Sequence, residues 1–313
     1  MAGSVASTMK RWAKRRLLGY VPGVLVRRYR PGMTRVLRRG SGAQHGPRVP
    51  IYVVIAGWME EDIIYAAVTH AFEQGADRVL LIDNGSTDQT ITEACAAGAE
   101  HLVTHWSDHV DERLRYDLIN AQIRHRSKWS GLDKIWWLVI DADEFVTGPQ
   151  GQTVRQFLNG VDERCRVVGT RVLDHFPDPG RTYEWRTNPL AVQSTCIELP
   201  SNWCPAAHQK HPAILWGRSL PEITVHPGSH HVGCSAAALY EPEETLVMHH
   251  HPYRSLDHTA ARLEIVARRG TWDHLDARRH SIEAVFRGDY AQVLNYRTQQ
   301  LGISPRPWTE FGC

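Results

Sequence analysis

The chain of 313 residues has no hydrophobic run long enough to cross a membrane. The longest apolar stretch near its start, residues 17–26, is interrupted by Gly19, Pro22 and Gly23 and is shorter than the ~20 residues of a spanning helix. Basic residues flank this stretch on both sides and no small-residue cleavage pattern follows it, which argues against a signal peptide. We expect a cytoplasmic protein, with peripheral contact at the inner face of the membrane as an open alternative.

Cysteine is scarce and unpaired in the sequence. The six cysteines form no C-x-x-C pair, and a chain of this length can bury a core without disulfides, so we expect reduced thiols. Cys204, His208 and His211, with Cys234, fit no standard zinc-finger spacing, and we expect no structural zinc site.

Several catalytic motifs are also missing. The sequence contains no H-E-x-x-H, G-x-S-x-G or G-x-G-x-x-G, and no G-x4-G-K-[ST]. Zincins, serine hydrolases, dinucleotide-dependent dehydrogenases and P-loop kinases therefore lack their minimum residues.

Acidic residues are absent from residues 1–48, which contain twelve of the chain's 36 Lys and Arg residues. Residues 8–18 predict a short basic helix, and residues 40–49 are rich in glycine and polar residues, as in a linker. Such a segment is typical of contact with an anionic membrane surface. The alternatives are a disordered basic leader or unspecific contact with nucleic acid, and we expect no specific nucleic-acid partner.

From residue 49 onward, apolar runs alternate with amphipathic stretches. Ile63, Ala67 and Ala71 recur at helical spacing between two apolar runs, and Gly75 suits a helix C-terminus. The pattern predicts strands at residues 51–56, 79–82, 101–104 and 135–140, and helices at residues 60–74, 87–97 and 111–126. Repeated βαβ units predict an α/β fold with a Rossmann-like, mostly parallel sheet flanked by helices.

The second half is less regular, with short β-like runs at residues 167–173 and 223–226 and a helical pattern at residues 256–301. We predict one large domain over residues 49–313. Its parts would be a nucleotide-binding half (49–150), an acceptor half (151–255) and a helical C-terminal tail (256–313).

Acidic residues follow two of the predicted strands. Asp83 ends one strand, and Asp141 and Asp143 follow the six apolar residues 135–140. In open α/β sheets ligands bind at the carboxyl ends of strands, and residues i and i+2 of an extended chain point the same way. Two carboxylates so placed suit Mg²⁺ or Mn²⁺. The alternative is a solvated acidic turn, but the buried strand and the second acidic strand end favour a metal site.

Three motifs together resemble a known family. They are E-E-D-I-I at residues 60–64, I-D-N-G-S-T-D at residues 82–88 and I-D-A-D-E-F at residues 140–145. This order is similar to the family 2 type of glycosyltransferases with the GT-A fold, in the branch whose metal motif reads D-x-D-E-F. The resemblance covers residues 49–146 and implies a GT-A fold, a UDP- or GDP-sugar donor and an Mn²⁺ or Mg²⁺ cofactor.

The resemblance also implies residue roles. Asp83 would contact the base or ribose, and Asp141 and Asp143 would bind the metal that bridges the diphosphate. Glu144 would orient that site or the sugar, and Arg115 would pair with a phosphate. The nucleotide-sugar site would thus include Asp83, Arg115, Asp141 and Glu144. The alternatives are a capping role for Asp83 in an Asn-Gly turn and a solvated helix face for Arg115.

A third metal ligand is implied by residues 249–255, H-H-H-P-Y-R-S, because a similar segment follows the acceptor region in this branch of the family. His250 occupies the matching position, and imidazole is an acceptable ligand for Mn²⁺. The alternative is that these histidines only form hydrogen bonds within a loop.

The catalytic base is the least defined residue. Family 2 members invert the anomeric centre, which requires a carboxylate to accept the proton of the acceptor hydroxyl. Asp174 is our first choice, with Asp178 and Glu184 as alternatives, because the E-D pair of many family 2 enzymes is absent from this region. Without a Q-x-x-R-W motif we expect single, non-processive transfers to an unidentified sugar, lipid or small-molecule acceptor.

Two other functions, nucleotidyl transfer and a non-catalytic scaffold, fit the sequence less well. A nucleotidyltransferase on a similar fold usually has a glycine-rich basic loop after its first strand, whereas residues 57–61 read G-W-M-E-E. A non-catalytic membrane-surface scaffold would have no need to keep Asp83, Asp141 and Asp143 together. A metal-dependent, hexosyltransferase-like enzyme is therefore the favoured interpretation.

Overall fold

The structure is a computed structural model. It describes residues 26–28, 48–106, 111–178, 181, 183–184, 186–198, 210–234, 239–254, 260–261, 264, 283, 287 and 306–311. The predicted basic helix and nearly all of the predicted linker and helical tail lie outside the described residues. No helix among those described is long and apolar enough to cross a membrane.

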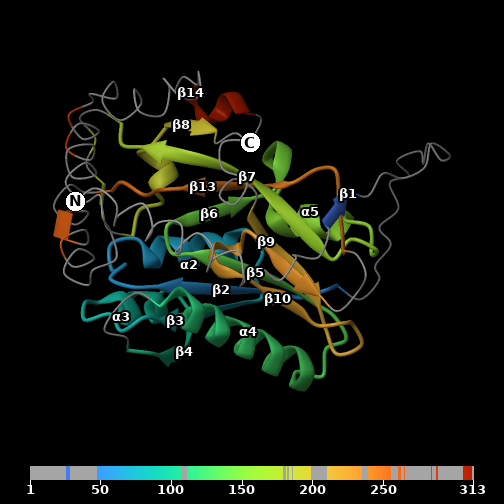
Figure 1. Cartoon of the computed structure of the whole chain (residues 1–313). Helices are drawn as coiled ribbons and strands as arrows, with labels where there is room; N and C mark the ends of the chain where they lie inside the picture. The colour runs from blue at the N-terminus through green and yellow to red at the C-terminus, as the bar shows by residue number, and fades with distance from the viewer. Residues whose placement is uncertain are drawn as a thin grey trace, which may run out of the picture.

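The first half of the central sheet is parallel and is built from the predicted βαβ units. All four predicted strands are confirmed to within one residue at each end. The helix predicted from residue 60 begins later, at Ile64, because residues 61–63 form a turn first. The strands lie in the order β5 (Ile135–Asp141), β2 (Ile51–Gly57), β3 (Arg78–Asp83) and β4 (Glu100–Thr104), with α2 (Ile64–Glu73), α3 (Thr90–Ala96) and α4 (Glu112–Trp129) as the helices of this half (Figure 1).

The second half of the sheet is mainly antiparallel. β9 (Lys210–Trp216) pairs with β5 and with β7 (Val167–Phe176), and β8 (Thr195–Glu198) and β14 (Arg306–Pro307) complete that edge. The α/β fold with helices flanking the sheet is confirmed. The sheet is mixed as a whole, since the parallel arrangement is confined mainly to the half in which strands and helices alternate.

A branch of the sheet carries part of the candidate site. β13 (Leu246–His250) runs parallel to β7 and antiparallel to β6 (Glu144–Thr147). The smaller elements are β1 (Val26–Arg28) with β12 (Leu239–Glu241), β10 (Ile223–Val225) with β11 (Val232–Cys234), α5 (Val154–Gly160), and the 3₁₀ turns η1 (Pro149–Gly151), η2 (Pro189–Ala191), η3 (Pro227–Ser229) and η4 (Trp308–Phe311).

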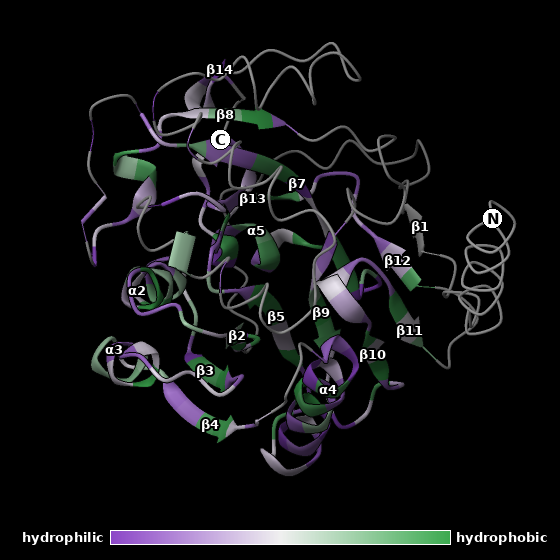
Figure 2. Cartoon of the chain, turned by 60° about the vertical axis from the view of Figure 1, so that its left-hand side comes forward, coloured by the Kyte–Doolittle hydropathy of each residue, from purple (hydrophilic) through white to green (hydrophobic). Residues whose placement is uncertain are grey.

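The core lies on both faces of the parallel strands. Successive side chains of a strand point to opposite faces, and all seven residues of β2 are buried. Val53 and Ile55 pack in a cluster with α2, α3 and α5, whereas Val54 and Ala56 pack with α4 and the β10–β11 hairpin. Helices on both faces explain the continuous apolar runs of β2 and β5. The hydropathy colouring in Figure 2 shows hydrophilic residues on α4 and on the edge strand β4.

Candidate active site

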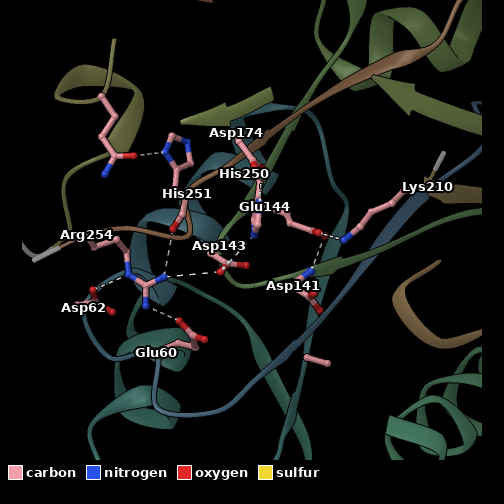
Figure 3. A network of polar contacts seen from close by, with 12 residues as sticks. Glu60, Asp62, Asp141, Asp143, Glu144, Asp174, Lys210, His250, His251 and Arg254 are labelled. Carbon is pink, nitrogen blue, oxygen red and sulfur yellow. Dashed lines mark hydrogen bonds and ion pairs between the residues drawn. The ribbon is translucent and has the colours of Figure 1, made fainter. Parts of the chain in front are cut away.

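Strand register brings the predicted acids to one edge of the sheet. Gly57 at the end of β2 pairs with Asp83 of β3, and Ala56 pairs with Asp141 of β5. On the other side, His250 of β13 pairs with Glu144 of β6 and with Asp174 of β7. Residues that lie far apart in the sequence therefore meet beyond the carboxyl ends of the parallel strands (Figure 3).

Asp141 is held at the end of β5 by a cation from α4. Arg115 forms an ion pair with the Oδ1 atom of Asp141 and donates a hydrogen bond to the carbonyl oxygen of Ala56 at 3.1 Å. Burial alone would raise the pKa of Asp141, but the charges of Arg115 and Lys210 lower it below its usual value. The side chain of Arg115 is 12% exposed, so it belongs to the site and not to a solvated helix face.

Glu144 is buried and stabilises the backbone of the metal motif. Its Oε2 atom accepts a hydrogen bond from the backbone N–H of Asp141 at 3.0 Å, and its Oε1 atom forms an ion pair with Lys210. Burial raises the pKa of Glu144, and Lys210 offsets only part of this shift. The carboxylates of Glu144 and Asp141 in turn raise the pKa of Lys210 despite its burial. Lys210 had no sequence signal, because it begins an antiparallel strand that the hydrophobic pattern did not predict.

Asp143 faces His250 across the site. The Nε2 atom of His250 lies 3.8 Å from Oδ2 of Asp143, and its Nδ1 atom lies 2.8 Å from Oδ1 of Asp174 (Figure 3). Although burial opposes protonation, the hydrogen bond to Asp174 and the charge of Asp143 raise the pKa of His250 to about 9. Asp174 is buried, with 2% exposure. Its hydrogen bond to Nδ1 fixes the orientation of the imidazole, so that Nε2 faces Asp143.

A buried arginine joins the first motif to the metal motif. Arg254 is 1% exposed, and its guanidinium donates to Oδ2 of Asp62 at 2.7 Å and to Oε2 of Glu60 at 2.8 Å. It also lies 3.9 Å from Oδ2 of Asp143. The sequence alone indicates no role for Arg254. Its partners Glu60 and Asp62 belong to the E-E-D motif of the family resemblance.

The residues of this edge fit a divalent cation. No group of three His, Cys, Asp or Glu side chains in the described part of the chain is already arranged to hold a metal. However, the 3.8 Å between His250 Nε2 and Asp143 Oδ2 is shorter than twice the ~2.1 Å of a typical Mg²⁺–ligand distance, so both atoms can reach one ion when the ion displaces the Nε2 proton of His250. Magnesium commonly binds one or two carboxylates and completes its coordination with water and substrate phosphates.

The charge balance of the network also fits a cation. Counted over the described residues, six carboxylates meet three permanent cations, which leaves an excess of negative charge before His250 is considered. A diphosphate would be repelled from such a site unless a cation were bound with it. The carboxylates belong to Glu60, Asp62, Asp141, Asp143, Glu144 and Asp174, and the cations to Arg115, Lys210 and Arg254.

Asp83 lies at the same edge but is turned into its own loop. It is fully buried, and its carboxylate accepts hydrogen bonds from the backbone N–H groups of Gly85 at 3.0 Å and Ser86 at 3.1 Å. The hydroxyl of Ser86 accepts a hydrogen bond from the N–H of Met59 at 2.9 Å. The geometry is that of the capping alternative, and direct contact between Asp83 and a nucleotide stays a prediction.

The other candidates for the catalytic base lie elsewhere. Asp178 accepts hydrogen bonds from the backbone and hydroxyl of Ser194, and Glu184 is exposed in the following loop. Neither Asp178 nor Glu184 belongs to the network of polar contacts around Asp143 and His250. Of the zinc alternative, Cys204 and His208 lie outside the described residues.

The neighbours of His250 in the sequence are directed into the protein core. His249 Nδ1 lies 2.9 Å from His175 Nε2, and His251 Nδ1 lies 2.8 Å from Oε1 of Gln193. His70 is buried nearby, with its ring 5.1 Å from that of Phe145. Burial lowers the pKa of His70 and of His175 to about 4, so these side chains are neutral at pH 7. Of the three consecutive histidines, the pairing at Asp143 and Asp174 selects His250 for the site.

The buried histidines predict a loss of stability in acid. The unfolded state protonates at the ordinary pKa of 6.5 and the native state of His70 only at about 4. The free energy of unfolding should therefore fall as the pH decreases through this window, by roughly 1.4 kcal/mol per pH unit for each such histidine. His70→Gln, which keeps a donor for the carbonyl of Val146, should flatten the dependence measured by urea unfolding between pH 6.5 and 4. The exposed His125, changed to Gln, serves as the control and should leave the slope unchanged.

Comparisons with known proteins do not assign a family. No family model and no curated protein matches the chain. Solved structures that align with the chain include glucosyl-3-phosphoglycerate synthase from Mycobacterium tuberculosis in complex with phosphoglyceric acid, at 18% identity over 72% of this chain and 81% of that chain, with a TM-score of 0.32. The same synthase with Mn²⁺, uridine diphosphate and glucosyl-3-phosphoglycerate gives 15% identity, the same coverage and a TM-score of 0.33. A mycobacterial protein gives 18% identity over 72% and 76% of the two chains, with a TM-score of 0.33. These values are too low to transfer a function, which must be argued from the site.

Proposed function

We propose that the protein is a metal-dependent glycosyltransferase of the family 2, GT-A type. It moves a sugar from a UDP- or GDP-sugar to an acceptor, with Mn²⁺ or Mg²⁺ as the cofactor. The observation that carries this proposal is the pairing of Asp143 with His250, 3.8 Å apart, beside Asp141 at the carboxyl edge of the parallel strands. The three motifs of the sequence resemblance converge on this edge.

Each polar residue of the edge has a task in such a reaction. Asp141, Asp143 and His250 would hold the cation, which when bound neutralises the charge that develops on a departing diphosphate. Arg115 and Glu144 fix Asp141 by its carboxylate and by its backbone N–H. Asp174 fixes the ring of His250. Arg115 and Lys210 are the cations nearest to Asp141 and would contact the phosphates when the donor binds.

Transfer would occur with inversion and one sugar at a time, as the resemblance implies. A base must then take the proton from the acceptor hydroxyl, and Asp174 was the first choice from the sequence. Its burial and its hydrogen bond to His250 support a positioning role instead, like the carboxylates that orient metal-binding histidines. The acceptor would approach from the side of residues 151–255, which line the other half of the sheet.

The role of Asp174 can be tested by changing it to asparagine. If Asp174 orients His250, Asp174→Asn should weaken Mn²⁺ binding roughly 10- to 100-fold, measured by electron paramagnetic resonance of the free ion. A catalytic base would behave differently, because turnover would fall while Mn²⁺ affinity stayed the same. Asp178→Asn, at an acid outside the His250 network, is the matched control.

The alternatives have less support. In a nucleotidyltransferase, the loop after the first strand would be basic and rich in glycine. Here the loop contains Glu60, which is buried and accepts a hydrogen bond from Arg254. This acidic arrangement offers no site that would bind a phosphate. A scaffold without catalysis would have no need to keep Asp141 at the same edge of the sheet as Asp83. We also propose that the basic N-terminal segment contacts the inner face of the membrane, in the cytoplasm. Most of this segment lies outside the described residues.

Isothermal titration calorimetry with UDP and GDP, each with and without Mn²⁺, tests the proposed function. We expect binding of one or both nucleotides that requires the metal. If neither nucleotide binds under any condition, the protein is not a glycosyltransferase of UDP- or GDP-sugars.

A further inference from the structure

Trp106 is a large aromatic side chain that remains 66% exposed directly after β4. Exposure by itself assigns no role to it, since Trp129 at the end of α4 is 77% exposed. The two residues differ in location. β4 runs parallel to β3, so Trp106 lies at the carboxyl edge of the strands, whereas Trp129 lies beside Tyr52 and Arg78 at their amino ends. Only the first location is the end at which α/β sheets bind nucleotides.

The ring of Trp106 lies against the loop that follows Asp83. The N–H of His105 donates to the carbonyl oxygen of Asp83 at 3.0 Å, which ties the end of β4 to that loop. A Cβ atom on Gly85 would lie 2.7 Å from Cε3 of Trp106, so the ring packs directly on the glycine. Gly85 has a φ of +80°, a backbone conformation that residues with a side chain rarely adopt. The sequence resemblance implies no role for Trp106. Its role is inferred from the residues that surround it in the structure.

The loop beneath the ring is already ordered. The carboxylate of Asp83 accepts two of its backbone N–H groups, and Ser86 accepts one from the loop after β2. An aromatic face on a rigid support can bind a flat ligand without the entropic cost of ordering the loop. We propose that the indole of Trp106 is the surface on which the nucleobase of the donor stacks. This inference rests on the proposed function, because it names the base site of the same nucleotide-sugar.

A buried polar atom lies in the loop that carries Gly85. Asn84 Oδ1 has no hydrogen-bond partner among the described residues. Buried polar atoms without partners are rare and each calls for an explanation, such as a role in binding. An amide oxygen can only accept, so a donor group of a bound ligand would satisfy it.

Calorimetry on Trp106 variants tests the stacking. Trp106→Ala should bind UDP or GDP in the presence of Mn²⁺ roughly 5- to 150-fold more weakly than the intact protein, the range expected for loss of one base–aromatic stack. Trp106→Phe should recover most of the affinity. Mn²⁺ with pyrophosphate, which lacks a base, should bind equally to all three proteins. Trp129→Ala is the matched control, as another largely exposed tryptophan at the opposite end of the strands.

The outcomes separate this inference from the proposed function. If UDP and GDP bind the intact protein and Trp106→Ala equally well, the stacking role is wrong and the glycosyltransferase proposal stands. Equal weakening of nucleotide and pyrophosphate in Trp106→Ala would show a structural effect and would also overturn the stacking role. If the intact protein binds neither nucleotide, both proposals fail together.

Discussion

Replacing Asp143 with alanine is expected to remove metal-dependent nucleotide binding and to reduce turnover by at least about 100-fold. The expected size follows from the role of the cation, which neutralises the leaving diphosphate in a site that otherwise has excess negative charge. The fold should survive the change. His250 keeps its hydrogen bond to Asp174, and Arg254 keeps its bonds to the first motif. Calorimetric titration of UDP and GDP with Mn²⁺ into Asp143→Ala measures the effect.

Asp133 provides a control in the same region of the chain. It precedes β5, at the end of the strand opposite to Asp143, and its side chain is 77% exposed beside Arg218. Asp133→Ala removes one carboxylate without touching the carboxyl edge, so its nucleotide affinity should equal that of the unmodified protein. Unchanged Mn²⁺-dependent binding by Asp143→Ala would show that the cation, if one binds, is not held by the D-x-D motif.

The parallel half of the fold could be predicted from the sequence because its signals are local. β2 and β5 are buried on both faces and therefore read as continuous apolar runs, and the helices between strands carry their own periodicity. Once the strands are parallel, the acids that follow β3 and β5 must meet at one edge. The convergence of Asp83 with Asp141 thus needed no knowledge of tertiary contacts.

The antiparallel half could not be predicted in the same way. The strands β6, β8 and β13 have only four or five residues each, and the pairing of these strands and of β9 depends on contacts between residues distant in the sequence. The register of β13 against β6 and β7 decides that His250, and neither of its histidine neighbours, lies between Asp143 and Asp174. Lys210 reaches Glu144 through a similar long-range pairing of β9. The family resemblance supplied His250, whereas the residues that orient it became apparent only from the structure.

Removal of the side chain of Arg254 should strongly reduce stability. Glu60 and Asp62 are 5% and 1% exposed, and Arg254 supplies charge-assisted hydrogen bonds to both. Removing one partner of a buried ion pair leaves the other charge without compensation, which typically costs about 3–5 kcal/mol. We expect Arg254→Ala to lose about this amount in the free energy of unfolding, measured by urea denaturation at pH 7. Much of the total stability of an ordinary domain, about 5–15 kcal/mol, would then be lost.

A matched ion pair on the surface separates burial from charge. Arg124 contacts Glu222 through two nitrogen atoms, but its side chain is 43% exposed, so Arg124→Ala should cost no more than about 1 kcal/mol. Arg254→Lys retains the charge and loses the planar fork that serves two carboxylates at once, so its stability should lie between those of the alanine variant and the unmodified protein. Equal stabilities of Arg254→Ala and Arg124→Ala would contradict a structural role for the buried arginine. In that case the link between the E-E-D motif and the metal motif would have to be explained by their backbone contacts alone.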